Sequence, residues 1–267
     1  MADGGWMERR RTAFGPIADL YEEARPSYPP ALVADVLAYA GAGEGDRLLE
    51  IGAGTGKATR LFAAGGLQVV ALEPSPAMAE VARRECAELA NVTLIESTFE
   101  AWRAPPGAFR LVMAAQAWHW VDPAVGYARA RVALGAGGAL ALFWNRADWR
   151  PGALTAALDA IYAPLAGTAS ASGPVTTAPA GRAGDEGWAE EIGAAGAFAE
   201  PEVRDYPWSR RYSAGEYARL LATHSDHAVL DAQVRARLLA RVEEAIAGAG
   251  GTIEIAYVTR LCLARAS

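Results

Sequence analysis

A glycine-rich turn with acidic residues nearby is the part of this sequence best suited to chemistry. Gly52, Gly54 and Gly56 follow the apolar run 47–51 and precede a helical stretch that begins at Lys57. A strand, a glycine turn and a helix in this order are typical of nucleotide sites, because glycine lets a ligand approach the backbone closely. The turn therefore predicts a nucleotide-type ligand at the end of the first strand.

The residues around the turn do not fit two common nucleotide motifs. A dinucleotide fingerprint would need glycine where Lys57 stands. A phosphate-binding loop would need glycine in place of Ile51 and a hydroxyl in place of Ala58. Both motifs fail at defined positions, so another nucleoside ligand has to be considered.

Two acidic residues indicate which ligand that is. Glu50 lies just before the turn, where it would repel a pyrophosphate and suit a cation. Glu73 follows Gly52 by 21 residues, about the spacing at which a strand–helix–strand unit brings a carboxylate to ribose hydroxyls. The pattern favours a positively charged nucleoside, and S-adenosylmethionine fits through its sulfonium and ammonium groups.

The elements that must position these residues alternate between strand and helix. Strands are expected at 47–51, 68–72, 92–95, 111–115 and 139–144, with helices at 30–40, 57–64, 76–89 and 123–134. Strands that are apolar on both faces and alternate with helices predict a parallel sheet covered on both sides, a doubly wound α/β fold. Later segments predict strands at 203–208 and 252–263, and helices at 155–165, 214–223 and 231–247.

Composition narrows the classes of partner. The 267 residues include 25 basic and 31 acidic ones, and the net charge of −6 argues against nucleic acid. Two cysteines and three histidines cannot build a four-ligand structural zinc site in paired spacings or an iron–sulfur cluster, so no metal is expected. There is neither a signal-peptide pattern nor an apolar run of membrane-spanning length, which predicts a cytoplasmic protein without a membrane partner. A monomer or homodimer is expected.

Several linked motifs resemble those of the class I S-adenosylmethionine-dependent methyltransferases, in the small-molecule branch with a ubiquinone/menaquinone-methylase kind of domain. The resemblance covers roughly 14–144. It rests on the segments Tyr21-x-x-x-Arg25-Pro-x-Tyr28-Pro, Leu48-Leu-Glu-Ile-Gly-Ala-Gly-Thr-Gly56, Ala71-Leu-Glu-Pro-Ser75, Glu96-Ser-Thr-Phe-Glu100, Ala115-Gln-Ala-Trp-His-Trp120 and Gly137-Gly-Ala-Leu-Ala-Leu-Phe-Trp-Asn145.

The resemblance implies a seven-stranded, mostly parallel Rossmann-like sheet with its last strand antiparallel and a small helical cap or lid. It divides the chain into an N-terminal cover (1–29), a cofactor-binding core (30–150), an insertion or lid (151–200) and a C-terminal completion of the sheet with a helical cap (201–267). Within the insertion, 166–187 is rich in Ala, Gly, Ser, Thr and Pro, so it could equally be a surface connector.

The resemblance also implies site residues. The glycine turn would pass under the methionine part of S-adenosylmethionine, Glu73 would bind the ribose, and the residues after the second and third strands would surround the adenosine. Arg25 could instead form a surface ion pair. The full set expected to bind the cofactor is Tyr21, Arg25, Glu50, Gly52, Ala53, Gly54, Gly56, Glu73, Pro74, Ser75, Thr98, Phe99, Gln116 and Ala117.

Methyl transfer from a sulfonium is an in-line displacement, so positioning the acceptor and excluding water supply most of the catalysis. A general base helps when the acceptor carries a proton, and histidine is the natural choice. His119, just after the fourth strand, and His224 are the catalytic candidates, or they orient the substrate. The residues expected to bind substrate are Trp118, Trp120, Asn145 and Trp149, although the tryptophans could also fill space between core and cap.

The sequence thus predicts an enzyme that moves a methyl group from S-adenosylmethionine to an oxygen, nitrogen or carbon of a small molecule, with aromatic metabolites or natural products among the candidates. S-adenosylhomocysteine is the expected product. One alternative is a protein that binds the cofactor without transferring its methyl group. Another is a nicotinamide-dependent oxidoreductase on the same fold, which Lys57 and Glu50 disfavour.

Overall fold

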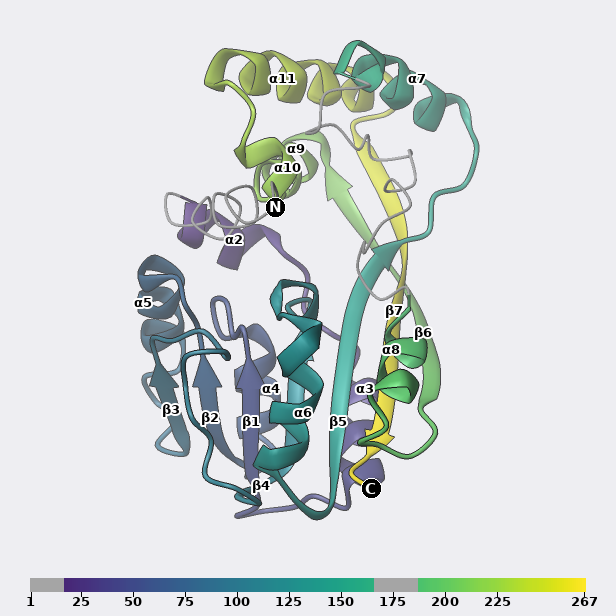
Figure 1. Ribbon diagram of the computed structural model, residues 1–267. Coiled ribbons are helices and arrows are strands. Elements are labelled where there is room, and N and C mark those ends of the chain that lie inside the picture. Colours follow the sequence, from purple (N-terminus) through teal and green to yellow (C-terminus); the bar gives the residue numbers. More distant parts are fainter. Residues whose placement is uncertain (1–16, 166–186) are drawn as a thin grey trace. The chain divides into compact units, whose positions relative to one another are not determined.

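A computed structural model describes residues 17–165 and 187–267 (Figure 1). The chain divides into two compact units. We call the first the helical unit (Met1–Pro26, Ala147–Gly181 and Pro207–Val258) and the second the sheet unit (Ser27–Arg146, Arg182–Tyr206 and Thr259–Ser267). These units combine distant segments, whereas the four parts expected from the sequence are contiguous; that division stays a prediction.

The described residues form one seven-stranded sheet in the order β3-β2-β1-β4-β5-β7-β6. Strands β1, β2, β3, β4 and β5 pair in parallel with their neighbours, and β7 runs antiparallel (Figure 1). This confirms the predicted fold class. The strands are β1 (Arg47–Ile51), β2 (Gln68–Leu72), β3 (Val92–Ile95), β4 (Phe109–Ala115), β5 (Leu134–Ala147), β6 (Glu202–Ser213) and β7 (Thr252–Arg265).

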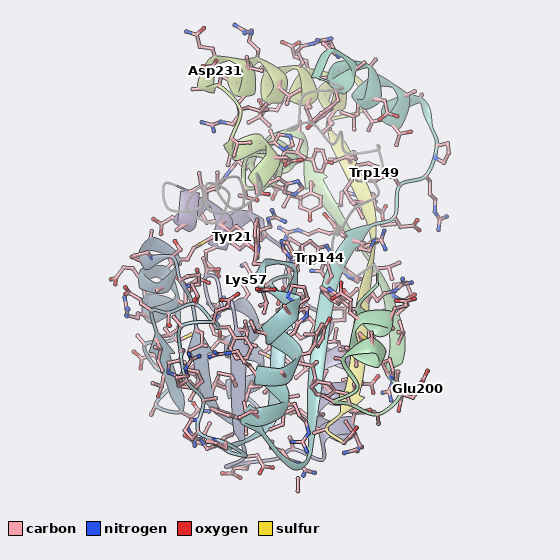
Figure 2. All side chains as sticks on the ribbon, viewed as in Figure 1. Tyr21, Lys57, Trp144, Trp149, Glu200 and Asp231 are labelled. Carbon is pink, nitrogen blue, oxygen red and sulfur yellow. The ribbon has the colours of Figure 1, made fainter. Side chains whose placement is uncertain are left out.

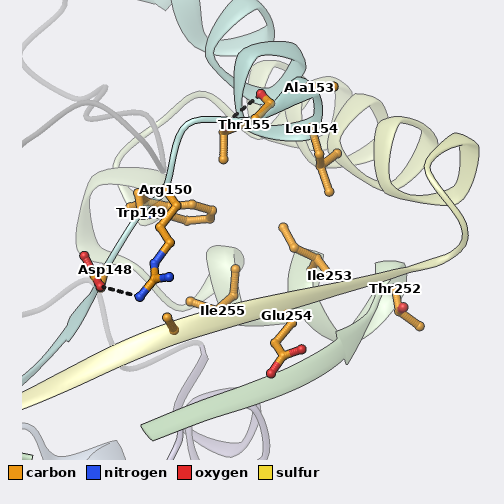
Figure 3. Close-up of a pocket in the computed structure, with 12 residues that line it drawn as sticks. Asp148, Trp149, Arg150, Ala153, Leu154, Thr155, Thr252, Ile253, Glu254 and Ile255 are labelled. Atoms are coloured by element: carbon orange, nitrogen blue, oxygen red, sulfur yellow. Dashed lines mark hydrogen bonds and ion pairs between the residues drawn. The ribbon is translucent and has the colours of Figure 1, made fainter. Parts of the chain in front are cut away.

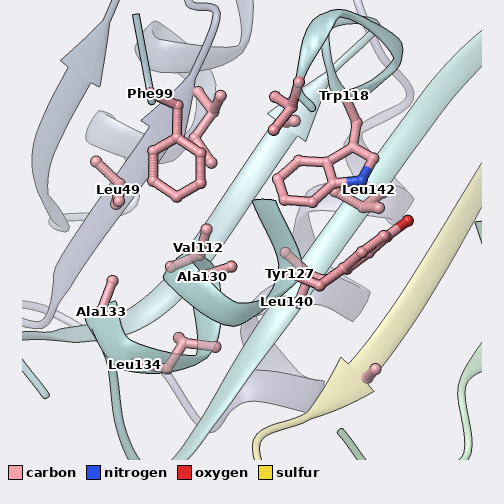
Figure 4. Packing of buried hydrophobic residues seen from close by; sticks show 14 of the residues in the cluster. Leu49, Phe99, Val112, Trp118, Tyr127, Ala130, Ala133, Leu134, Leu140 and Leu142 are labelled. Atoms are coloured by element: carbon pink, nitrogen blue, oxygen red, sulfur yellow. The ribbon is translucent and has the colours of Figure 1, made fainter. Parts of the chain in front are cut away.

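Helices cover both faces of the sheet because its strands are apolar on both sides. Adjacent residues of β1 show this directly: Leu48 packs into one buried cluster and Leu49 into another. Figure 4 shows part of the cluster around Leu49, where Phe99, Trp118 and Tyr127 meet the strands. The helices of the sheet unit are α3 (Pro30–Ala40), α4 (Lys57–Ala63), α5 (Pro76–Glu85), η2 (Trp118–Trp120), α6 (Pro123–Ala133) and α8 (Trp188–Ala195).

The helical unit has a core of its own, rich in tyrosine. Tyr212 and Tyr257 are buried with a hydroxyl–hydroxyl distance of 3.0 Å, and Trp208 stacks on Tyr257 at 4.3 Å. The helices of this unit are α2 (Ala18–Ala24), α7 (Ala153–Tyr162), η3 (Ala163–Leu165), α9 (Ala214–Ala222), α10 (Ser225–Ala228) and α11 (Ala232–Gly248).

Most predicted elements have counterparts, with differences at their ends. Strand β5 begins five residues before the predicted 139–144 segment, and β6 continues to Ser213 beyond the predicted 203–208 segment. The insertion predicted at 166–187 lies outside the described residues except for Gly187. No helix in the described ranges has the length and apolar character needed to cross a membrane.

The cap of α11 gives a test of stability. The Asp231 carboxylate accepts hydrogen bonds from the backbone N–H groups of Gln233 at 2.9 Å and Val234 at 3.2 Å. We expect Asp231→Ala to lower the free energy of unfolding by about 1 kcal/mol, because it exposes two N–H groups of the first turn. Thermal or urea unfolding measures this loss. Gln233→Ala is the control because it leaves the capping carboxylate in place, and equal effects of the two substitutions would contradict the assignment.

Candidate functional site

The glycine turn after β1 requires glycine for two physical reasons. Gly52, Gly54 and Gly56 have φ angles of +70°, +59° and +84°, in the left-handed region that other residues rarely adopt. A Cβ atom on Gly52 would lie 2.5 Å from the Cβ of Ala117, so this position also lacks room for a side chain. A Cβ on Gly54 would meet no atom within 4 Å, so the backbone there borders open space that a ligand can occupy.

Glu73 is held rigidly at the end of β2. Its Oε2 accepts a hydrogen bond from the backbone N–H of Gly54 at 2.8 Å, and its Oε1 accepts one from the N–H of Ser75 at 2.9 Å. The ends of β1 and β2 are neighbours because Ile51 and Leu72 are paired in register. The carboxylate therefore ties the turn to the next strand, and a carboxylate has further lone pairs for ligand hydroxyls.

Glu50 is a buried acid that makes fewer hydrogen bonds than its carboxyl group can accept. It is 0% exposed, and its Oε2 accepts a hydrogen bond from the Thr59 hydroxyl at 2.6 Å. Its Oε1 is buried and has no hydrogen-bond partner in the described part of the chain. Burial raises the pKa of Glu50 to about 8, the Glu73 charge adds to the increase, and the Thr59 bond opposes it. Such a group fits a cationic ligand, which would supply the missing partner and favour the ionised form.

The residue after β4 has a conformation that ordinary side chains avoid. Gln116 has φ of +56°, the one positive value among the described non-glycine residues. Its backbone N–H donates to the Phe143 carbonyl at 2.8 Å, and its side-chain amide donates to the Tyr28 hydroxyl at 3.2 Å. Backbone strain of this kind concentrates at functional sites. Ala117, next in the chain, is the residue that faces Gly52.

The residues expected around the adenosine lie at the ends of β2 and β3. Ser75 caps α5 and Pro74 is exposed. The Thr98 hydroxyl accepts a hydrogen bond from the Ala101 N–H at 3.1 Å, and Phe99 is buried with its ring 6.3 Å from that of Trp118. These positions are compatible with an adenosine pocket, and contact with the nucleoside stays a prediction.

His119 belongs to an aromatic cluster in the sheet unit. Its ring centroid lies 4.4 Å from that of Trp120 and 4.7 Å from that of Trp144, which in turn lies 6.4 Å from that of Trp188. Trp144 is labelled in Figure 2. We call these four residues the His119 cluster. They come from η2, β5 and α8, and they combine an imidazole with the flat faces that suit an aromatic or cationic ligand.

Two of the residues expected to bind substrate have structural partners instead of open surface. Trp118 is 2% exposed and packs against Tyr127 at 5.0 Å between ring centroids. The Asn145 amide donates to the Ser27 carbonyl at 3.2 Å and accepts from the Thr259 hydroxyl at 2.6 Å. These contacts favour packing and hydrogen-bonding roles, and contact of either side chain with an acceptor stays a prediction.

Four predicted site residues, Tyr21, Arg25, Trp149 and His224, belong to the helical unit. Arg25 donates to the hydroxyl of Thr223 at 2.8 Å and to its carbonyl at 3.0 Å, and its guanidinium lies 5.1 Å from the centre of the Tyr21 ring. Burial lowers the pKa of His224 well below its usual value, and the Arg25 charge lowers it further. His224 is therefore a neutral imidazole at neutral pH.

Trp149 lines a pocket of about 340 Å³ in the helical unit (Figure 3). Leu154, Ile253 and Ile255 supply apolar walls, while Arg150 and Glu254 supply charge. The volume falls in the range of small-molecule sites. Trp149 was expected to bind substrate, but no sequence motif indicates the pocket, because its walls come from two segments about a hundred residues apart.

Comparisons of the sequence with known proteins find methyltransferases. A family profile described as a methyltransferase domain matches residues 48–138. An uncharacterised methyltransferase of Mycobacterium tuberculosis is 40% identical over 140 residues, which are 52% of this chain and 55% of the relative. A probable S-adenosylmethionine-dependent methyltransferase of Saccharomyces cerevisiae is 31% identical over 110 residues, 38% of this chain and 36% of the relative. The chain thus spans about half the length, or less, of these curated relatives.

Solved structures show the same fold. A protein of Anaeromyxobacter dehalogenans, provisionally assigned as a type II methyltransferase, superimposes with a TM-score of 0.66 at 22% identity, over 90% of this chain and 97% of the other. Phosphoethanolamine N-methyltransferase 2 of Haemonchus contortus, solved with S-adenosylhomocysteine bound, gives 0.55 at 16% identity, over 93% of this chain and 56% of the other. Residues 48–138 thus match a methyltransferase domain, and the chain has the Rossmann-like fold of the class I S-adenosylmethionine-dependent methyltransferases.

Proposed function

We propose that this protein transfers the methyl group of S-adenosylmethionine to a small-molecule acceptor and releases S-adenosylhomocysteine. The observation that carries the proposal is the pair of acids at the glycine turn. Glu73 is fixed by two backbone N–H groups, and Glu50 is buried with an oxygen that has no partner among the described residues. A nucleoside with ribose hydroxyls at one end and a cationic amino acid at the other satisfies both groups.

Each part of the turn has a defined task in holding this cofactor. Glu73 accepts from the ribose hydroxyls, and Glu50 balances the positive charge of the methionine part. The open side of Gly54 lets the ligand approach the backbone, and Gln116 and Ala117 border the methionine part on the β4 side. Pro74, Ser75, Thr98 and Phe99 surround the adenosine.

The bound cofactor supplies an activated methyl group, and the chain's own residues position the acceptor. In-line transfer needs the acceptor atom close to the methyl carbon and water excluded, which demands positioning more than bond-making groups. The His119 cluster supplies flat aromatic surface for an acceptor and one imidazole that can accept a proton. His119 is therefore the proposed general base when the acceptor atom is protonated.

Several features favour a small molecule over a macromolecule as acceptor. The net charge of −6 opposes binding to nucleic acid. The aromatic composition of the His119 cluster suits a flat organic acceptor, so aromatic metabolites and natural products come first in the search. We propose a cytoplasmic enzyme that acts as a monomer or homodimer.

Release of S-adenosylhomocysteine during incubation with a panel of acceptors tests the proposed function. The panel should begin with aromatic hydroxyl and amine compounds and include tRNA and a protein mixture. Turnover on at least one small molecule is the expected result. Turnover on tRNA or protein with none on any small molecule would overturn the proposed acceptor class.

Removal of the ribose-binding carboxylate should weaken cofactor binding. We expect Glu73→Gln to reduce the affinity for S-adenosylhomocysteine by at least about 10-fold, because hydrogen bonds to a charged group contribute about 1.5–3 kcal/mol each. Isothermal titration calorimetry measures the affinity. Glu80→Gln is the matched control, since Glu80 lies on α5 and its side chain is 75% exposed beside Arg83. Equal affinity in the Glu73 variant and the control would refute the ribose role.

Glu50 predicts a pH dependence of stability in the cofactor-free protein. Its pKa of about 8 in the folded state exceeds the usual 4.5, so between these values the folded state holds the extra proton. The stability that this proton confers is lost as the pH rises towards and through 8, on the order of 3–5 kcal/mol in total.

The variant Glu50→Gln is neutral at every pH and should not show this loss. Urea unfolding between pH 5 and 8.5 should find wild type falling relative to the variant as the pH rises. In the same variant, we expect weaker binding of S-adenosylmethionine because the negative partner of its cation is gone. Parallel pH curves for the two proteins would disprove the buried, protonated state of Glu50.

The proposed base gives a kinetic prediction. Once an acceptor with an ionisable proton is known, His119→Phe should lower kcat by about 10²- to 10⁴-fold while affinity for S-adenosylhomocysteine stays unchanged. Phenylalanine retains an aromatic ring beside Trp120 and removes the proton acceptor. Trp144→Phe serves as control because it alters the same cluster without removing a titratable group. An unchanged kcat in the His119 variant would assign the imidazole to packing.

A further inference from the structure

Three potential metal-binding side chains meet at α10 in the helical unit. His224, Asp226 and His227 each offer one donor atom, and these three atoms lie within 4.8 Å of one another. His224 is the residue that precedes the helix, and the other two lie in its single turn. Because the three residues lie within four positions of the chain, two imidazoles and a carboxylate come close together. The proposed methyl transfer does not use this cluster.

His227 is already oriented as a ligand would be. Its side chain is 3% exposed, its Nδ1 lies 2.9 Å from Oδ1 of Asp226, and its Nε2 lies 2.7 Å from the hydroxyl of Tyr162 on α7. In metal sites, the ring nitrogen that does not bind the ion commonly holds a hydrogen bond that fixes the ring. Tyr162 can supply that bond at Nε2, which leaves Nδ1 facing Asp226.

His224 distinguishes this cluster from an ordinary hydrogen-bonded network. Its ring centroid lies 5.8 Å from that of His227, yet its imidazole makes no hydrogen bond with any residue in the described ranges. The network of Tyr162, His227 and Asp226 is complete without it. A neutral imidazole that lies against a carboxylate and a second imidazole has a lone pair to offer, and a metal ion would use it.

We propose that His224, Asp226 and His227 form a binding site for a divalent transition-metal ion, with Zn²⁺ as the best match. Two imidazole nitrogens and one carboxylate oxygen are a donor set that zinc accepts, with a fourth position for water. Ligands at zinc bond lengths of 2.0–2.2 Å lie about 3.4 Å apart around a tetrahedral ion. Nδ1 of His227 and Oδ1 of Asp226 lie 2.9 Å apart, and all three donor atoms lie within 4.8 Å of one another. The proposed site therefore requires side-chain rotations that bring the three donors to the separation set by the ion.

The charges around the cluster support binding and also limit it. The Asp226 carboxylate is the one acidic group of the cluster, and its Oδ1 lies 2.9 Å from Nδ1 of His227. Arg25, whose charge acts on His224, opposes a dication. The expected affinity is therefore below that of a four-ligand structural zinc site. This proposal departs from the sequence-based expectation of no metal, which considered sites built from cysteine and histidine.

Zinc binding to the full chain, produced without a histidine tag and treated with EDTA, tests the proposal. Titration calorimetry and metal analysis after dialysis should show one Zn²⁺ per chain and no comparable binding of Mg²⁺. Co²⁺ bound at the same site should show the visible absorption of nitrogen ligation. Wild-type protein that binds no Zn²⁺ would overturn the proposal.

Substitutions of the proposed ligands test whether the ion binds at this cluster. His224→Gln should weaken Zn²⁺ binding at least 10-fold and remove the Co²⁺ absorption, while His119→Gln, which removes a histidine from the sheet unit, should leave both unchanged. Circular dichroism establishes that each variant is folded, and Asp226→Asn is the second test if His224→Gln does not fold. Zinc binding that persists at wild-type strength in the folded His224 or Asp226 variant, or that disappears with His119→Gln, would place the ion elsewhere and refute the proposed site.

Discussion

The carboxylate of Glu73 is the interaction on which the cofactor site depends. It accepts one hydrogen bond from the turn after β1, at Gly54, and one from the start of the next turn, at Ser75. These two bonds fix the separation of two loops that follow neighbouring parallel strands. The glycine turn can then adopt its left-handed backbone, with Gly52 against Ala117, and present its open side to a ligand. The Glu73 carboxylate thus stabilises the two loops and is also the group proposed to bind the ligand.

Glu50, in contrast, lowers the stability of the fold while it suits the binding of a ligand. A fully buried acid with one oxygen that has no partner among the described residues costs folding free energy, and the cost appears as a pKa raised to about 8. Such a cost is typical of a binding group that receives its partner from a ligand. The same site contains Gln116, whose left-handed backbone is also unfavourable in isolation. Two unfavourable features of the sheet unit, the buried acid Glu50 and the left-handed backbone of Gln116, therefore lie where the cofactor is proposed to bind.

Much of the sheet unit could be predicted from sequence, because its information is local. Leu48 and Leu49 are both buried, on opposite faces, so a short continuous apolar run was enough to predict a strand of a doubly wound sheet. The absence of the dinucleotide motif at Lys57 and the spacing from Gly52 to Glu73 favoured S-adenosylmethionine as the ligand, in agreement with the methyltransferase-domain profile over residues 48–138. The start of β5 could not be predicted because its first residues, Leu134 to Gly138, are rich in glycine, which is not typical of strands.

The properties that depend on distant contacts were not visible in the sequence. The hydrogen bond between Tyr162 and His227 joins residues 65 positions apart, and the walls of the pocket beside Trp149 come from two remote segments. The amide contacts of Asn145 with Ser27 and Thr259 likewise depend on the fold. Sequence spacing could nominate Asn145 and His224 as functional residues, but only the folded chain shows which partners they have.

Thermal unfolding of the purified protein with S-adenosylhomocysteine, S-adenosylmethionine, NAD or NADP tests the central claim most directly. At about 100 times the dissociation constant, a ligand that binds only the folded state adds about 2.7 kcal/mol, which raises Tm by several degrees. The two acids at the glycine turn predict a rise with both adenosyl ligands and none with the nicotinamide dinucleotides. A rise with NAD or NADP, or no rise with either adenosyl ligand, would contradict the account of the turn and of the site built around it.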